Sequence, residues 1–174
     1  MNSTRTMCLV VASLAMTVGA YAVRSATTDR QAVRPQPAAD AIKNLTELTY
    51  PQVYVGSDGE THFRDIRVPL VSETTAPPAE PIAQSAPQPA TTIRHAAFPP
   101  HWGVHDREHG IFHNASGARF ITIRRGVIWI RVSDGDTRRF QGGDVVEVLD
   151  VAPSRGHITW TGDEPVLALF SNHP

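Results

Sequence analysis

Cysteine is nearly absent from this chain of 174 residues, which contains only Cys8. No disulfide can form within one chain, and one thiol cannot build a cysteine-based metal site. Excess charge of either sign is also lacking, because the formal net charge is -1 with histidine neutral. This balance gives no electrostatic reason to expect nucleic acid or an anionic membrane surface as a partner.

Motifs for covalent catalysis are missing as well. The chain has no Gly-x-Ser-x-Gly element, no glycine-rich phosphate loop and no pair of carboxylates at a recognisable spacing. Serine and threonine occur mainly in segments without apolar periodicity. The sequence therefore identifies no catalytic residue and leaves open whether the protein is an enzyme.

Residues 1–22 have the pattern of a secretory signal peptide. Arg5 precedes an uncharged apolar run from Met7 to Ala20, and Ala20-Tyr21-Ala22 has the small-x-small pattern that precedes a cleavage site. The run is shorter than the roughly 20 residues of a membrane span. We therefore predict a periplasmic or secreted protein with no stable membrane insertion after cleavage; an uncleaved anchor is the alternative.

Residues 23–47 are predicted to be a disordered tether. Up to about residue 40 the segment is rich in polar residues, proline and alanine and lacks apolar periodicity, so it cannot bury enough surface to offset chain entropy. Asp40 then precedes Ile42, Leu45 and Leu48 at helical spacing, which favours one or two helical turns.

From residue 48 to residue 172 the pattern is that of a single all-β domain. A hairpin is predicted from Gln52–Val55 and Thr61–Leu70, which flank an Asp-Gly turn. Five prolines between residues 72 and 92 exclude a central strand there. We interpret this stretch as an extended segment that wraps over the domain surface, with a flexible linker as the alternative.

The C-terminal half has the clearest strand pattern. Runs of β-branched and aromatic residues alternate with short glycine-containing turns, which predicts a β-sandwich or barrel. The predicted strands are 119–124, 127–132, 137–141, 145–149, 157–161 and 166–170.

The ordered series that begins at Gly126 resembles the core of the cupin family. It contains a turn glycine, a hairpin closed by Asp134-Gly135, an aromatic residue, and Gly143-Asp144 followed by apolar residues. Residues 58–70 resemble the first strands of a group of small single-domain cupins. The resemblance covers roughly residues 50–171 and implies one jelly-roll β-barrel.

Cupin metal sites use two motifs. The first is His-x-His, followed after three or four residues by Glu and after six more residues by Gly. The second motif supplies another histidine. Counting back from Gly126, the two histidine positions fall on His113 and Ala115, and the glutamate position falls on Arg119. The second motif ends at His157. The resemblance therefore implies a degenerate metal site in which His113 and His157 remain.

A guanidinium in place of the carboxylate repels a cation and favours carboxylate or phosphate groups. If Arg119 points inward, we expect a small anionic ligand, with Trp129 and Trp160 as candidate apolar walls. The alternatives are a solvated Arg119 and tryptophans that pack in the core. Whether His113 and His157 bind one divalent transition metal (Zn, Fe, Mn or Ni) or none stays open.

Four histidines recur at every fourth position: His101, His105, His109 and His113. Two prolines, Gly103 and Gly110 interrupt the segment, so we predict a loop beside the barrel mouth rather than a helix. Imidazoles and carboxylates in such a loop suit Zn or Cu; solvated histidines are the alternative.

Three functions remain as hypotheses. The first is an exported module that binds a small anionic molecule through Arg119, His113 and His157. The second is a metal-dependent cupin enzyme of the dioxygenase or isomerase type, which uses the two histidines. The third is a structural or assembly role. Whether the chain forms a homodimer stays open.

Overall fold

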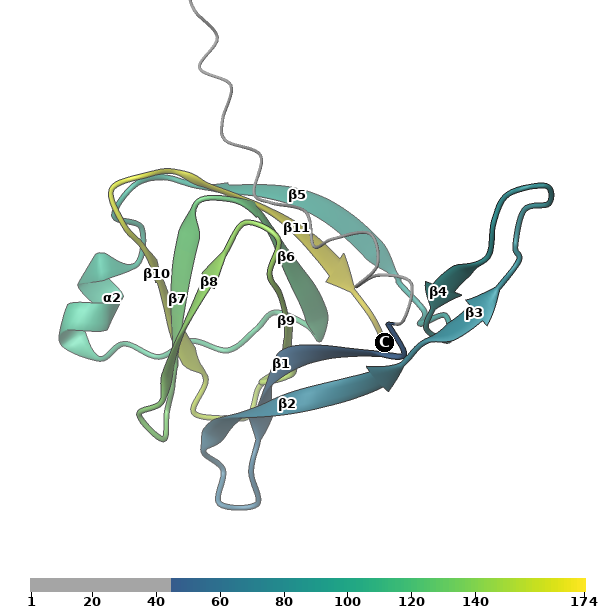
Figure 1. Ribbon diagram of the computed structural model, residues 1–174. Helices are drawn as coiled ribbons and strands as arrows, with labels where there is room; N and C mark the ends of the chain where they lie inside the picture. Colours follow the sequence, from purple (N-terminus) through teal and green to yellow (C-terminus); the bar gives the residue numbers. More distant parts are fainter. Residues whose placement is uncertain (1–44) are drawn as a thin grey trace, which may run out of the picture. The chain divides into compact units, whose positions relative to one another are not determined.

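A computed structural model of the chain describes residues 45–174, and this part is mostly β-structure with one short helix, α2 (Val104–His109) (Figure 1). Residues 1–44 lie outside the described part, and with them the predicted signal peptide and most of the predicted tether. The strands are β1 (Glu47–Val55), β2 (Thr61–Pro69), β3 (Val71–Glu73), β4 (Ile82–Gln84), β5 (Thr92–Phe98), β6 (Arg119–Arg125), β7 (Val127–Val132), β8 (Thr137–Gln141), β9 (Val145–Val148), β10 (His157–Thr161) and β11 (Val166–Asn172).

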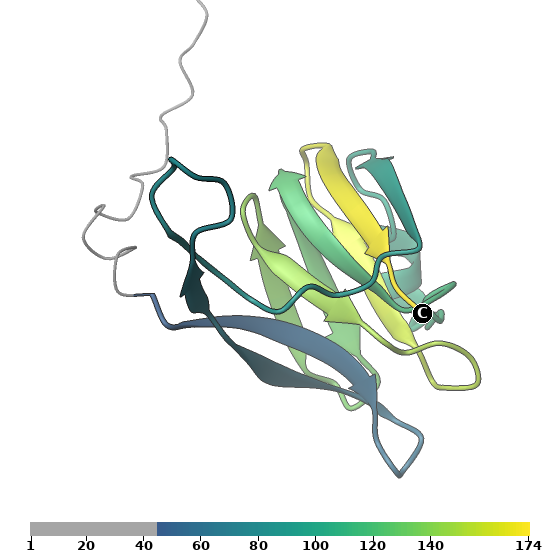
Figure 2. The same ribbon diagram turned by 90° about the vertical axis from the view of Figure 1, so that its right-hand side faces the viewer.

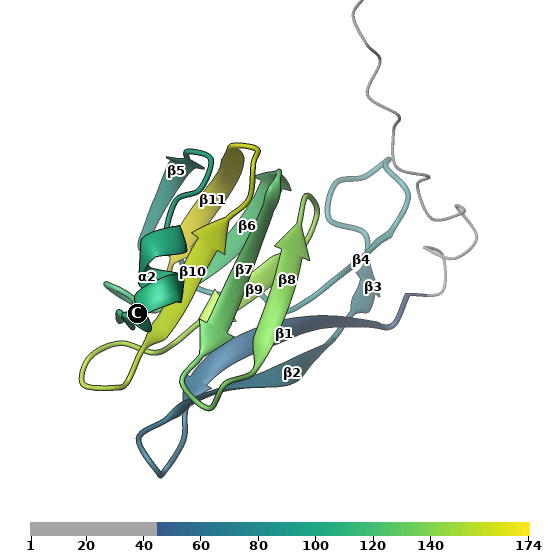
Figure 3. The same ribbon diagram turned by 90° about the vertical axis from the view of Figure 1, so that its left-hand side faces the viewer.

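The strands form three sheets. The large sheet has the order β2-β1-β9-β6-β11-β5. It is a mixed sheet, because β1 and β9 are parallel and all other neighbouring strands in it are antiparallel. The small sheet has the order β10-β7-β8, and β3 pairs with β4 alone in a separate ladder. The large and small sheets face each other (Figures 1 and 3).

The hydrophobic core lies between these two sheets. Along β7 every second side chain is fully buried, namely Ile128, Ile130 and Val132, as expected for a strand with one face toward a core. Ile123 of β6 and Val146 of β9 join them in one cluster. The alternation of the sequence thus fixes which face of each strand meets the other sheet.

The predicted strand pattern is confirmed most closely in the C-terminal half. The strands predicted at 127–132, 137–141 and 157–161 coincide with β7, β8 and β10. The hairpin predicted around the Asp-Gly turn is β1–β2. A mostly β architecture is therefore shown, while a single closed jelly roll remains an interpretation.

Two local predictions are wrong. Helical turns were expected to extend to Leu48, but Glu47 and Leu48 belong to β1; the earlier part of that segment lies outside the described residues. The segment 104–109 is a helix and not a loop. Gly103 and Gly110 both adopt the left-handed conformation and mark its two ends, so they bound the helix instead of interrupting it.

The proline-rich stretch also differs from expectation. Its first part does not wrap over the domain, because β3 and β4 form a hairpin that projects from the body (Figures 1 and 2). Its last part does run over the domain: residues 85–88 line a cavity together with Tyr50 and Phe120, and Thr91 donates its N–H to the Asn172 carbonyl. The prolines of this stretch lie outside the paired residues of β3 and β4, so their missing N–H groups remove no hydrogen bond between the two strands. β5 was not predicted at all, although it forms one edge of the large sheet.

Within residues 45–174, no helix has the length and apolar character needed to cross a membrane.

Candidate functional site

A cavity of about 270 Å³ lies between the two sheets. We call it the His–Arg cavity, because three of its lining residues are His113, His157 and Arg119. The comparison with the cupin motifs therefore selected three residues that line the same cavity. The other lining residues are Phe98, Trp102, Asn114, Ala115, Ser116, Ile121, Ile128, Val148, Thr159 and Phe170.

His113 and His157 are held together by their backbones. Each donates its N–H to the other's carbonyl oxygen, at 3.0 and 2.9 Å, and their rings lie 4.7 Å apart between centroids. Gly156 makes this approach possible. A Cβ added there would lie 2.4 Å from the His113 oxygen, and the φ of +80° also favours glycine.

His157 forms a buried pair with Asp150. Its Nδ1 lies 2.6 Å from one Asp150 carboxylate oxygen, and both residues are almost completely buried. The other carboxylate oxygen has no hydrogen-bond partner among the described residues. Asp150 fixes the orientation of the imidazole, so that Nε2 is the ring nitrogen left for other partners.

His113 is disposed to stay uncharged. Burial lowers the pKa of His113 below the usual 6.5, and the nearby His157 lowers it further, while Asp150 and Asp106 act in the opposite direction. A neutral imidazole offers one donor and one acceptor. The inner wall of the cavity can therefore exchange hydrogen bonds with a ligand without a fixed charge on His113.

Arg119 points toward the cavity rather than toward solvent. Its Nε donates to the Gly117 carbonyl at 3.0 Å, its Nη2 donates to Ser116 Oγ at 2.6 Å, and its guanidinium lies 5.2 Å from the Phe170 ring centre. Burial lowers the pKa of Arg119, and the positive charge of Arg94 lowers it further, whereas Asp150 raises it. No carboxylate of residues 45–174 lies within salt-bridge distance of this guanidinium.

Aromatic side chains form the apolar part of the wall. Phe98 packs edge-on against Trp102, with 4.9 Å between ring centres, and lies 6.1 Å from Phe170. Trp102 also contacts His113 edge-on. The cavity therefore places an aromatic surface beside one guanidinium and two imidazoles.

Trp129 and Trp160 are not part of this cavity. They lie directly opposite each other on β7 and β10, on the face of the small sheet that points away from the core, and their rings are stacked with an interplanar angle of 6°. Arg107 of α2 lies over Trp160. Strand alternation explains the difference, because their neighbours Ile128, Ile130 and Thr159 take the inward positions.

The donors in this part of the chain do not make a complete metal site. No group of three histidine, cysteine, aspartate or glutamate side chains within residues 45–174 is arranged to hold an ion. One carboxylate oxygen of Asp150 already binds His157, and Arg119 adds a positive charge to the same cavity. On α2, only His105 and His109 meet, with ring centres 4.2 Å apart.

Sequence reasoning missed two residues that line the cavity, Phe98 and Trp102, and two that lie next to its polar groups, Arg94 and Asp150. Arg94 and Phe98 belong to β5, which carried no recognised strand pattern. Asp150 follows β9 in a loop, and nothing in its local sequence indicated that its carboxylate would reach His157. Trp102 lies in the segment 101–113, where only the spacing of the histidines indicated a site.

A comparison with protein-family models finds no match for this chain. A search of curated proteins finds no relative either. The resemblance to cupins therefore stays a prediction from the motif.

Proposed function

We propose that the chain is an exported, cupin-like jelly-roll protein whose His–Arg cavity binds a small organic anion. Export rests on the signal pattern of residues 1–22, and the jelly roll rests on the motif series together with the two facing sheets. The anion rests on the cavity itself.

Arg119 is the observation that carries the proposal. A guanidinium is charged at every physiological pH, and its planar fork of N–H groups favours carboxylate and phosphate partners. The hydrogen-bond acceptors of Arg119 in residues 45–174 are neutral, a carbonyl and a hydroxyl. A carboxylate or similar anion at the cavity would supply the missing charge and could accept two parallel N–H bonds.

The size and lining of the cavity restrict the rest of the ligand. At about 270 Å³ it lies just below the roughly 300–1,000 Å³ typical of sites for drug-sized molecules. Phe98, Trp102 and Phe170 favour a flat or branched apolar body. The imidazoles of His113 and His157 suit one further hydrogen-bonding group on the ligand.

Binding can be tested with benzoate, phenylacetate and isovalerate as probes, and with their amides as uncharged counterparts. Trp102 in the wall makes intrinsic fluorescence a suitable readout. We expect saturable binding of at least one acid and weaker binding of its amide. Arg119→Met should weaken acid binding by about 10- to 100-fold, the range for one lost charge-assisted hydrogen bond.

Arg124→Met is the matched control, because Arg124 lies on the same strand but is exposed. It should leave the affinity for the acid unchanged. Equal binding by the Arg119 and Arg124 variants, or equal binding of acid and amide, would contradict the proposal, and so would no binding by any of the three acids.

A metal-dependent enzyme is the competing function, favoured by one feature. Histidines that bind a metal through one ring nitrogen commonly donate the other ring N–H to a carboxylate. His157 has this arrangement, because its Nδ1 binds Asp150 and its Nε2 is left for another partner. Elemental analysis of the purified protein beside His113→Ala and His157→Ala separates the two functions. A near-stoichiometric metal lost in both variants would favour the enzyme and count against the anion module.

A further inference from the structure

A second guanidinium, that of Arg94, stands beside the His–Arg cavity. In the ladder between β5 and β11, Arg94 lies directly opposite Phe170, and Phe98 lies opposite Val166. Residues directly opposite each other on paired strands share one face of the sheet. Phe98 and Phe170 both line the cavity, so Arg94 is on the cavity face of β5. Because Arg94 is exposed and belongs to an edge strand, it stands at the rim of the cavity rather than in its wall.

Arg94 and Arg119 lie on opposite sides of β11. This strand pairs with β5 on one side and with β6 on the other, where Arg119 lies opposite Asn172. The Arg119 guanidinium lies 5.2 Å from the centre of the Phe170 ring, and Arg94 is the cross-strand neighbour of that same Phe170. Burial lowers the pKa of Arg119 most, and the positive charge of Arg94 lowers it further. The two guanidiniums are therefore near enough to repel each other.

Neither guanidinium has a carboxylate of its own in the described part of the chain. The arginines that do form ion pairs with carboxylates there are Arg67, Arg107, Arg138 and Arg155. Asp150 raises the pKa of Arg119, but Asp150 is buried and one of its oxygens binds His157. Two like charges thus flank Phe170, and within residues 45–174 no ion pair neutralises either of them.

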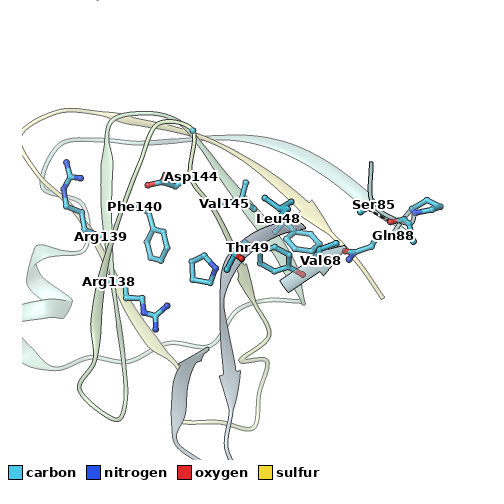
Figure 4. Close-up of a pocket in the computed structure, with 16 residues that line it drawn as sticks. Leu48, Thr49, Val68, Ser85, Gln88, Arg138, Arg139, Phe140, Asp144 and Val145 are labelled. Carbon is cyan, nitrogen blue, oxygen red and sulfur yellow. Dashed lines mark hydrogen bonds between the residues drawn. The ribbon is translucent and has the colours of Figure 1, made fainter. Parts of the chain in front are cut away.

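A larger cavity, of about 590 Å³, shows the contrasting case (Figure 4). Arg138 lines it and lies 2.6 Å from a carboxylate oxygen of Asp65 and 3.5 Å from one of Asp136. Asp144 adds another carboxylate to the lining. The charge of Arg138 is thus met by side chains of the protein, whereas the charges of Arg94 and Arg119 are left for a ligand.

We propose that the anion of the His–Arg cavity is a dicarboxylate, with one carboxylate held by Arg119 and the other by Arg94. The inference rests on the proposed function, to which it adds a second anionic group and a residue that determines specificity. Two separate carboxylates fit better than one phosphate, because the arginines extend from strands on either side of β11 and flank the ring of Phe170. A short aromatic or branched body between the carboxylates would pack on that ring.

Isothermal titration calorimetry of the purified full chain tests the proposal, with benzoate and its three dicarboxylate counterparts, phthalate, isophthalate and terephthalate. These ligands share one ring and one carboxylate and differ in the second carboxylate. We expect at least one dicarboxylate to bind about fivefold or more tightly than benzoate at low salt, the effect of a favourable exposed charge pair. This preference should shrink at high salt, because exposed charges are screened.

Arg94→Met separates the roles of the two arginines. It should bring the ratio of dicarboxylate to benzoate affinity from about five or more down to about one. Arg119→Met should weaken benzoate and the dicarboxylate together. Arg124→Met is the matched control, since Arg124 is exposed on β6, and it should keep the wild-type ratio. Circular dichroism confirms that each variant keeps its fold.

Three results would overturn the proposal: equal affinities of the wild type for benzoate and all three dicarboxylates, a preference that persists in Arg94→Met, or tighter binding of phenyl phosphate than of any dicarboxylate. The last result would assign both arginines to a single phosphate. If benzoate binding still depends on Arg119 in these cases, the proposed function stands and only the second carboxylate is lost. Absence of binding by benzoate and by every dicarboxylate would overturn both.

Discussion

At the scale of single residues, position relative to a sheet face decides what each histidine does. His157 points between the sheets and pairs with buried Asp150, whereas His62 lies near the ends of two hairpins, away from the cavity. His105 and His109 stack on an exposed helix. Identical side chains thus take a cavity role, a bridging role and a surface role within one domain.

His62 connects two turns through its ring. Its Nδ1 lies 2.7 Å from Asp134 in the β7–β8 turn, and its Nε2 lies 3.2 Å from Asp58 in the β1–β2 turn. The hydrogen bond to Asp58 raises the pKa of His62 above 6.5, and the bond to Asp134 adds to this. The same contact lowers the pKa of Asp58.

This geometry makes the contribution of His62 to stability depend on pH. A folded-state pKa above the unfolded value of 6.5 means that the contribution is complete below that pH and is lost as the pH rises through the raised pKa. We expect His62→Gln to lower the free energy of unfolding at about pH 6 and to have little effect at about pH 9, by urea denaturation.

His95→Gln, an exposed histidine of β5, is the matched control and should change stability equally at both pH values. An effect of His62→Gln that does not vary with pH would show that the ring acts by packing rather than by its charge.

At the scale of elements, glycines set where strands and the helix end and how closely they approach. Gly103 and Gly110 bound α2, and Gly156 lets the start of β10 bridge to His113. None of these contacts follows from the strand pattern alone. The His–Arg cavity depends on the last of them, because that bridge brings the two imidazoles together.

Gly156→Ala should therefore destabilise the protein more than an ordinary loop substitution. The added Cβ meets the His113 carbonyl and also occupies a left-handed φ. Gly59→Ala is a close control, since Gly59 has the same φ of +80° but nothing within 4 Å of an added Cβ. We expect both variants to lose about 1 kcal/mol for the backbone conformation, and Gly156→Ala to lose about 1–3 kcal/mol more.

Urea denaturation of the two variants measures the difference. Equal losses would mean that the backbone at residues 113 and 156 relaxes without strain, and would remove Gly156 as the residue that holds the two histidines together.

At the scale of the whole described domain, one core connects the large and small sheets. Ile130 of β7 is fully buried among residues of both sheets. We expect Ile130→Ala to lower the free energy of unfolding by about 2–5 kcal/mol, the range for a truncated buried aliphatic side chain. Leu167→Ala, at an exposed position of β11, should change it by about 0.5 kcal/mol or less.

Because the sheets share this core, unfolding followed by tryptophan fluorescence and by far-ultraviolet circular dichroism should give one coincident transition. Trp129 and Trp160 report on the small sheet, and the circular dichroism signal reports on all strands. Two separate transitions would show that the sheets unfold independently.

The sequence by itself determined the β-rich class and most strands of the C-terminal half. Alternation and turn chemistry are local properties, so β7, β8 and β10 were predicted with their observed bounds. The motif comparison also selected His113, His157 and Arg119 for one site. The strands follow from patterns of neighbouring residues, and the three site residues follow from the spacing of a family motif.

Only the tertiary structure decided what surrounds those residues. Arg94 reaches Arg119 through the pairing of β5, β11 and β6, and Asp150 reaches His157 through a loop. The pairing of β7 with β10 likewise places Trp129 and Trp160 away from the cavity, and β3 and β4 pair only with each other. Register between strands distant in sequence is settled by packing of the whole core, and no local pattern of residues carries that information.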